Sequence, residues 1–214
     1  MSAAGPADVA VRMDRMYRYQ RLIYDLTRKY YLIGRDRAID RLAPPKGGSV
    51  VEIGCGTGRN LVLAARRWPE AGFLGIDASR AMLRSAEAKI TAAGLASRVR
   101  LGFALAEDWD ARALGLGHGA DRILFSYALS MIDEPEAALE RARAQLAPGG
   151  RILVVDFADM AGLPALARRG LRAWLDRFGV HPKPEVGAWM ERTGPVRRTR
   201  LMGGYAEILE QGGV

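Results

Sequence analysis

The middle of the chain alternates short apolar runs with stretches of helical periodicity, and this alternation constrains the fold more than any other feature. The apolar runs indicate strands over residues 49–54, 72–77, 99–103, 123–127 and 151–157. Helical patterns cover residues 60–67, 79–93 and 136–146, with a Pro-Gly-Gly break at 148–150. Strands that alternate with helices form βαβ units, which build a parallel sheet covered on both faces. The sequence therefore predicts a doubly wound α/β sheet that binds ligands at the carboxyl ends of its strands.

Length and composition are those of one globular domain. The chain has 214 residues, of which 49% are apolar and 26% charged. A single cysteine excludes a disulfide framework and a multi-cysteine zinc site, and we expect no metal. The sequence has no apolar run of about 18 residues and no secretory leader near its start. We therefore expect a cytoplasmic protein that at most lies on a membrane surface.

Two amphipathic helices are expected outside the alternating region. The first covers residues 8–33, so that residues 1–34 would form a helical lid on a domain of residues 35–214. The second lies in a basic insertion, residues 158–190, where apolar residues recur from Leu163 to Phe178 and arginines take the opposite side. Such a helix either packs on the sheet with solvated charges or lies in an anionic headgroup layer. Residues 199–209 are expected to form two strands at the sheet edge.

The positive charge of the chain is concentrated at its two ends. The net charge is +8, yet residues 47–157 carry equal numbers of basic and acidic side chains. Residues 1–46 and 158–214 therefore carry the whole excess. Basic flanks suit an anionic partner, and a phospholipid surface, a nucleic acid and an acidic small substrate all meet that requirement. An arginine-rich protein without such a partner is the alternative.

A glycine-rich turn follows the first predicted strand. Its sequence runs from Glu52 through Gly54, Gly56 and Gly58 to Asn60. Glycines allow the backbone to approach a ligand closely, and the helix that follows supplies free amide donors. The spacing differs from the G-x-G-x-x-G pattern of dinucleotide binders, and the acidic Glu52 would repel a pyrophosphate. The turn therefore favours a ligand that carries positive charge.

Further polar residues end the next strands. Asp77 ends the second strand, where a carboxylate can accept both hydroxyls of a ribose. Asp77 or Ser79 could equally cap the following helix. Ala106 and Glu107 follow the third strand. In this order and spacing, residues 35–157 resemble the class I S-adenosylmethionine-dependent methyltransferases, which implies a Rossmann-like, mostly parallel seven-stranded sheet.

The resemblance implies a binding site for S-adenosylmethionine. The residues assigned to it are Glu52, Gly54, Cys55, Gly56, Thr57, Gly58, Asn60, Asp77, Ala78, Met82, Ala106, Glu107 and Ser126. The glycines would hold the methionine part, with Glu52 and Cys55 beneath it, and Asp77 would bind the ribose. The residues assigned to the adenine are Ala78, Met82, Ala106 and Glu107. The family often has an aspartate two residues before Glu107, where this chain has Leu105. The adenine contact is therefore assigned to Ala106 and Glu107.

The flanking segments narrow the resemblance. Residues 13–20, 23–37, 126–132 and 171–178 resemble the N-methyltransferase of bacterial betaine-lipid synthesis. That enzyme trimethylates the amine of diacylglyceryl-homoserine. The resemblance implies a lipid substrate, an anionic membrane surface on the inner face of the membrane, and the enzyme that makes diacylglyceryl-homoserine as partners. Phosphatidylethanolamine N-methyltransferases, a soluble methyltransferase of a small amine or RNA, and a non-catalytic cofactor-binding subunit are the alternatives.

The fourth strand leads into the expected acceptor position. The two prolines that methylases of nucleobase amino groups carry there are absent from Ser126–Leu129, so we expect no nucleic-acid partner. Tyrosine faces suit a methylated ammonium, and we assign Tyr24, Tyr30 and Tyr127 to the methyl-transfer site. Arg28, Arg35 and Arg37 are the candidates for binding the homoserine carboxylate, and His118 and His181 are expected to be surface residues.

Overall fold

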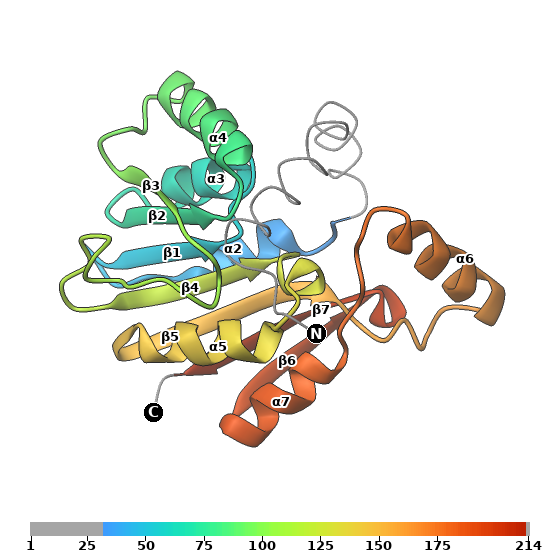
Figure 1. Ribbon diagram of the computed structural model, residues 1–214. Helices are drawn as coiled ribbons and strands as arrows, with labels where there is room; N and C mark the ends of the chain where they lie inside the picture. The colour runs from blue at the N-terminus through green and yellow to red at the C-terminus, as the bar shows by residue number, and fades with distance from the viewer. Residues whose placement is uncertain (1–31, 213–214) are drawn as a thin grey trace, which may run out of the picture.

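A mostly parallel sheet forms the centre of the computed structural model, which describes residues 32–212 (Figure 1). Its strands are β1 Ser49–Ile53, β2 Gly72–Asp77, β3 Val99–Phe103, β4 Ala120–Ser126, β5 Leu146–Phe157, β6 Val196–Leu201 and β7 Ala206–Gly212. The seven strands lie in the order β3-β2-β1-β4-β5-β7-β6. β1 to β5 pair in parallel, whereas β7 is antiparallel to both β5 and β6. The predicted doubly wound sheet with two late strands at its edge is confirmed.

Helices cover both faces of the sheet (Figure 1). The helices are α2 Arg35–Leu42, α3 Arg59–Arg67, α4 Arg80–Ala92, α5 Pro135–Ala144, α6 Ala165–Asp176 and α7 Glu185–Thr193, with short 3₁₀ turns η1 Leu129–Met131 and η2 Met202–Gly204. α2, α3 and α4 pack on one face, and α5 and α7 on the other. This arrangement leaves the carboxyl ends of the parallel strands between the two helical layers.

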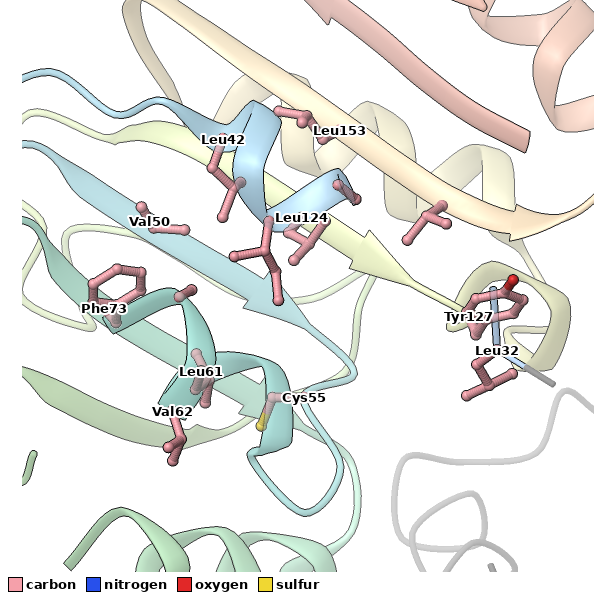
Figure 2. Packing of buried hydrophobic residues seen from close by; sticks show 14 of the residues in the cluster. Leu32, Leu42, Val50, Cys55, Leu61, Val62, Phe73, Leu124, Tyr127 and Leu153 are labelled. Atoms are coloured by element: carbon pink, nitrogen blue, oxygen red, sulfur yellow. The ribbon is translucent and has the colours of Figure 1, made fainter. Parts of the chain in front are cut away.

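The core explains why the central strands read as continuous apolar runs. In β1, Val50 packs on the face of α2 and α3, whereas Val51 and Ile53 pack on the face of α5. Successive side chains of a strand point to opposite faces, and here both faces are buried. Figure 2 shows the face of the sheet that α2 and α3 cover, where Leu42 of α2 lies over the sheet near Leu124 and Leu153. Burying one such leucine stabilises the fold by roughly 1.5–3 kcal/mol.

Three features of the first half and the sheet differ from the sequence predictions or extend them. The predicted helix over residues 8–33, and with it the lid, lies outside the described residues except for residues 32–34, which form a turn. α2 was not predicted; the Arg122 guanidinium donates to the carbonyls of Leu42 and Ala43 at its end, at 2.6 and 2.8 Å. The Pro-Gly-Gly break lies inside β5, where the register with β4 shifts, and does not precede the strand.

The basic insertion contains two helices. α7 was not predicted, and its Val186, Trp189 and Met190 are buried against the α5 layer. In α6 only Leu175 is fully buried. It belongs to the core layer on the α2 face of the sheet, and Leu171 is partly buried against that layer. Leu166 and Trp174, which the sequence pattern places on the same apolar stripe, are 78% and 38% exposed. α6 therefore packs through a narrow face and projects beyond the carboxyl ends of the strands (Figure 1). Within residues 32–212, no helix has the length and apolarity needed to cross a bilayer.

Candidate cofactor and acceptor site

Two adjoining cavities open at the carboxyl ends of β1, β2 and β4. We call the first the apolar cavity; Ile53, Ile76, Met82, Ala104, Met131 and Ile132 supply its apolar lining. We call the second the polar cavity; Arg35, Glu52, Cys55, Thr57, Arg59 and Asn60 supply most of its wall. Gly54, Gly56 and Ser126 line both. One extended ligand can therefore reach both cavities across the glycine turn.

Positive φ angles make the turn after β1 dependent on glycine. Gly54, Gly56 and Gly58 have φ of 68°, 54° and 73°, in the region that side chains with a Cβ disfavour. A Cβ on Gly54 would lie 2.9 Å from the Cβ of Ala128. Gly58 begins α3 and packs against Ala86, and it lines neither cavity. Gly54 and Gly56 therefore shape the ligand site, whereas Gly58 places the helix.

Asp77 connects the second strand to this turn. Its buried carboxylate accepts the amide of Gly56 at 2.8 Å and the amide of Ser79, also at 2.8 Å. The hydroxyl of Ser79 accepts the amide of Met82 at 3.3 Å, so Ser79 caps α4. Asp77 also lines the apolar cavity. A carboxylate can accept several hydrogen bonds at once, so Asp77 can accept those of ribose hydroxyls as well.

The polar cavity contains a buried carboxylate with one unused oxygen. Glu52 is 2% exposed, and its Oε1 accepts the side-chain amide of Asn60 at 2.8 Å. Its Oε2 has no hydrogen-bond partner among the described residues, and neither has the buried hydroxyl of Ser126. Burial raises the pKa of Glu52 to about 8. Unpartnered buried polar atoms beside a cavity indicate a polar ligand.

Arg35 supplies positive charge to the same cavity. Its side chain is buried, and its Nε donates to the carbonyl of Leu32 at 3.3 Å. Arg37, two residues along α2, is exposed and lines neither cavity, and Arg28 lies outside the described residues. Of the two described arginine candidates, only Arg35 lies at the site. A guanidinium and a carboxylate in one cavity match the carboxylate and ammonium of an α-amino acid.

The structure brings together nearly all the residues assigned to the cofactor. Glu52, Cys55, Thr57 and Asn60 line the polar cavity, and the residues on the adenine side line the apolar one. Those residues are Asp77, Ala78, Met82, Ala106 and Glu107. Thr57 also accepts a hydrogen bond from the ammonium of Lys89 at 3.0 Å. The geometry therefore fits S-adenosylmethionine, with its amino-acid end at Glu52 and Arg35 and its adenosine end toward Met82.

Tyr127 lies where the sequence places the acceptor. It has a φ of 55°, its side chain is buried, and its hydroxyl donates to the carbonyl of Ile33 at 2.7 Å. Its ring packs edge-on against Phe157, with centroids 4.8 Å apart, and Figure 2 shows it beside Leu32. Burial raises the pKa of Tyr127 above its usual value. Tyr127 is therefore uncharged, its ring is packed in the core, and the residue is one of those that line the apolar cavity.

The remaining residues singled out in the sequence are two tyrosines and two histidines. Tyr24 and Tyr30 lie outside the described residues, so their assignment to the site stays a prediction. His118 and His181 line neither cavity, as expected. His181 is exposed and its ring lies 3.3 Å from the carboxylate of Asp176. Residues 32–212 contain no group of three or more side chains suited to hold a metal ion.

The loop after β4 also forms part of the wall of the apolar cavity. Its residues Met131, Ile132 and Asp133 line the cavity, and the sequence predictions did not assign them to the site. The charged residues in this cavity's described lining are Asp77, Glu107 and Asp133, all of them acidic. The electrostatic potential of this lining favours a cationic ligand over an anionic one. The resemblance of residues 126–132 to the N-methyltransferase of betaine-lipid synthesis was the signal that could have found Met131 and Ile132.

Comparisons with known proteins identify the family of this chain. Residues 24–194 match a family described as a methyltransferase domain. A trans-aconitate 2-methyltransferase of Methylobacterium radiotolerans is 35% identical over 53% of this chain and 39% of its own length. A phosphatidylethanolamine N-methyltransferase of Cereibacter sphaeroides is 30% identical over 64% of each protein. The chain thus spans less than two thirds of either relative.

A solved structure shares the fold over the full length. An S-adenosylmethionine-dependent methyltransferase from Aquifex aeolicus superposes with a TM-score of 0.64 over 99% of this chain and all of its own, at 19% identity. The matched residues include the glycine turn, Asp77 and the wall after β4. The chain therefore belongs to the methyltransferase domain family and has the class I, Rossmann-like fold of that structure.

Proposed function

We propose that this enzyme methylates the amine of diacylglyceryl-homoserine three times at a membrane surface and so forms diacylglyceryl-N,N,N-trimethylhomoserine. The observation that carries the proposal is Asp133, on the wall after β4. Asp77 and Glu107 are assigned to the cofactor, so Asp133 is the charged residue of the apolar cavity's described lining that can face the acceptor, and this lining contains no Lys, Arg or His. Such a wall stabilises an amine that becomes a fixed cation and disfavours a polycarboxylate such as trans-aconitate.

The residues of the site suit methyl transfer to nitrogen without a metal ligand set. S-Adenosylmethionine supplies an electrophilic methyl group, which the amine lone pair attacks as the sulfur–carbon bond breaks. The amine must therefore lose its proton before the attack. Met131 and Ile132 line the apolar cavity, and their apolar side chains would limit access of water to the nitrogen. One tyrosine face stabilises a methylammonium by roughly 0.5–2 kcal/mol.

The lipid nature of the acceptor is supported by α6. Leu166 and Trp174 are exposed, and Arg168, Arg169, Arg172 and Arg177 lie on or directly after the same helix. Met202, at the tip between β6 and β7, is also exposed. Exposed apolar side chains among arginines suit the headgroup layer of an anionic membrane. Each Lys or Arg near such a surface contributes about 1 kcal/mol to binding.

Phosphatidylethanolamine is the second candidate acceptor. The similarity to the Cereibacter sphaeroides phosphatidylethanolamine N-methyltransferase favours it. The resemblance of residues 13–20, 23–37, 126–132 and 171–178 to the N-methyltransferase of betaine-lipid synthesis favours the homoserine lipid. A soluble small amine is the third candidate, and it would leave the exposed face of α6 without a role. The enzyme that makes diacylglyceryl-homoserine is the expected partner for the first candidate.

Parallel assays on the candidate lipids test the proposal. Labelled S-adenosylmethionine is incubated with vesicles that contain either diacylglyceryl-homoserine or phosphatidylethanolamine, and the products are identified by mass spectrometry. We expect a gain of three methyl groups on the homoserine lipid. Methylation of phosphatidylethanolamine alone would show that this lipid is the acceptor, and it would reject the homoserine lipid while leaving the proposed membrane contact in place. Methylation of neither lipid, with turnover of a soluble amine, would reject the lipid proposal.

A further inference from the structure

The segment between α6 and α7 contacts the loop that forms the acceptor wall. The amide of His181 donates to the carbonyl of Ser130 at 3.0 Å. The Lys183 ammonium donates to the carbonyl of Ile132 and, at 3.1 Å, to that of Asp133. These two carbonyls belong to residues that line the apolar cavity. A segment about 50 residues away in the sequence therefore holds this wall.

The sheet holds the same loop from the other end. The buried carboxylate of Asp156, near the end of β5, accepts the amide of Ser130 at 3.1 Å. The amide of Tyr127 donates to the carbonyl of Val155 at 2.8 Å. The stretch from Tyr127 to Ser130 is thus attached to β5, whereas Ile132 and Asp133 are attached to Lys183. Lys183 is a side chain that holds the far half of the wall.

The chemistry of lysine suits this position. An ammonium has three donors and no acceptor, so one group can bind two adjacent carbonyls at once. Hydrogen bonds from a charged donor are roughly twice as strong as neutral ones. The carbonyls follow η1, where a short 3₁₀ turn ends and the chain enters α5. Holding them sets the direction in which Met131, Ile132 and Asp133 face the cavity.

The same segment continues directly from α6. The carbonyl of Leu175, the buried residue of α6, accepts the amides of Phe178 and Val180 at 2.9 and 3.2 Å. Val180 is buried and precedes His181 and Lys183. The helix proposed to contact the membrane and the lysine that holds the acceptor wall are therefore parts of one continuous, packed stretch of chain.

We infer that Lys183 is a positioning residue for the acceptor: by binding the carbonyls of Ile132 and Asp133, it holds the wall against which the amine headgroup lies. The inference rests on the proposed role of this wall in acceptor binding. Lys183 acts through the loop and touches neither the cofactor residues nor the reacting atoms. Its loss changes acceptor binding and leaves cofactor binding intact.

Three variants test this inference. Lys183→Met keeps the aliphatic stem and removes the donors, Lys183→Arg restores a charged donor, and Lys46→Met is the matched control at an exposed lysine paired with Glu70. We expect Lys183→Met to raise the acceptor KM about 5- to 20-fold, with kcat and the affinity for S-adenosylhomocysteine changed less than about twofold. Lys183→Arg should recover most of the loss, and the control should match the wild type.

Hydrogen exchange supplies a second readout that needs no acceptor. In Lys183→Met bound to S-adenosylhomocysteine, amides of residues 128–134 should exchange at least about fivefold faster, while those of β1 keep their protection. Unchanged exchange and unchanged acceptor KM would overturn the inference. A parallel loss of cofactor affinity would also overturn it, because Lys183 would then support the whole domain. If the wild type methylates neither lipid, the proposed function fails, whereas the exchange result still decides whether Lys183 holds the wall.

Discussion

The carboxylate of Asp77 accepts the amide of Gly56 at 2.8 Å, and this hydrogen bond joins the end of β2 to the glycine turn after β1. The two residues are 21 positions apart, yet they form one edge of the apolar cavity. The carboxylate that would bind the ribose thus also holds the backbone that lies beside the cofactor. Loss of its charge should therefore affect cofactor affinity through both contacts.

Asp77→Asn should weaken S-adenosylhomocysteine binding by about 10- to 100-fold, because hydrogen bonds to a charged group contribute about 1.5–3 kcal/mol. Isothermal titration calorimetry measures the affinity directly. Asp40→Asn is the matched control, since Asp40 forms an exposed ion pair with Arg67 away from both cavities. Wild-type affinity in Asp77→Asn would remove Asp77 from the cofactor site.

The buried Glu52 should make the stability of the free enzyme depend on pH. Its pKa is about 8 in the folded chain and 4.5 in an unfolded chain, so between these pH values the folded chain binds more protons than the unfolded chain. The contribution of protonated Glu52 to the free energy of unfolding is fully present below pH 4.5 and is lost as the pH rises through 8. The free energy of unfolding should therefore fall by up to about 2 kcal/mol between pH 6 and pH 8.

Urea denaturation at several pH values measures this dependence. Glu52→Gln should flatten it, whereas Glu70→Gln, an exposed control, should preserve it. A cofactor ammonium near Oε2 favours the ionised carboxylate, so saturating S-adenosylhomocysteine should also reduce the slope. A wild-type slope that survives in Glu52→Gln would assign the titration to another group, such as Asp156, whose pKa burial raises to about 6.

The acidic wall can be tested at Asp133. Asp133→Asn keeps the shape of the side chain and removes its charge from the lining of the apolar cavity. We expect the KM of the amine acceptor to rise about 3- to 10-fold, because solvent partly screens the attraction between Asp133 and the amine. The cofactor affinity should not change. Steady-state kinetics at fixed, saturating S-adenosylmethionine provide the measurement. Asp108→Asn is the control, because Asp108 does not line the cavity. A lower KM in Asp133→Asn would contradict a cationic acceptor.

Charge reversal on α6 tests the membrane contact. Arg169→Glu should weaken binding to anionic vesicles at least about tenfold, because each basic residue near the surface contributes about 1 kcal/mol. Lys46→Glu introduces the same change at an exposed lysine before β1 and should bind like the wild type. Co-sedimentation at low salt gives the bound fraction. Equal losses in both variants would indicate a general charge effect and no docking by α6.

Local patterns in the sequence account for the elements that were predicted. The strands and helices from β1 to β5 follow from apolar periodicity, and the glycine turn follows from a motif whose residues are contiguous. The place of Asp77 near the turn follows because it ends β2, which pairs in parallel with β1, the strand before the turn. These features depend on neighbours within a few residues, so the sequence carries them directly. α2 and α7 escaped prediction because they are short and depend on burial against the sheet.

Tertiary packing decided the features that link distant residues. Arg35 lies in the polar cavity and Arg37 outside it, because Ala38, Ile39 and Leu42 orient α2 toward the core. The periodicity of α6 predicted an amphipathic helix, but only its packing shows that Leu175 is covered and Leu166 exposed. The contact of Lys183 with the wall after β4 joins residues about 50 positions apart. By itself the sequence determined the fold class and the cofactor turn, whose signals are local. The tertiary structure decided which charges meet in the cavities, because that depends on how separate elements pack.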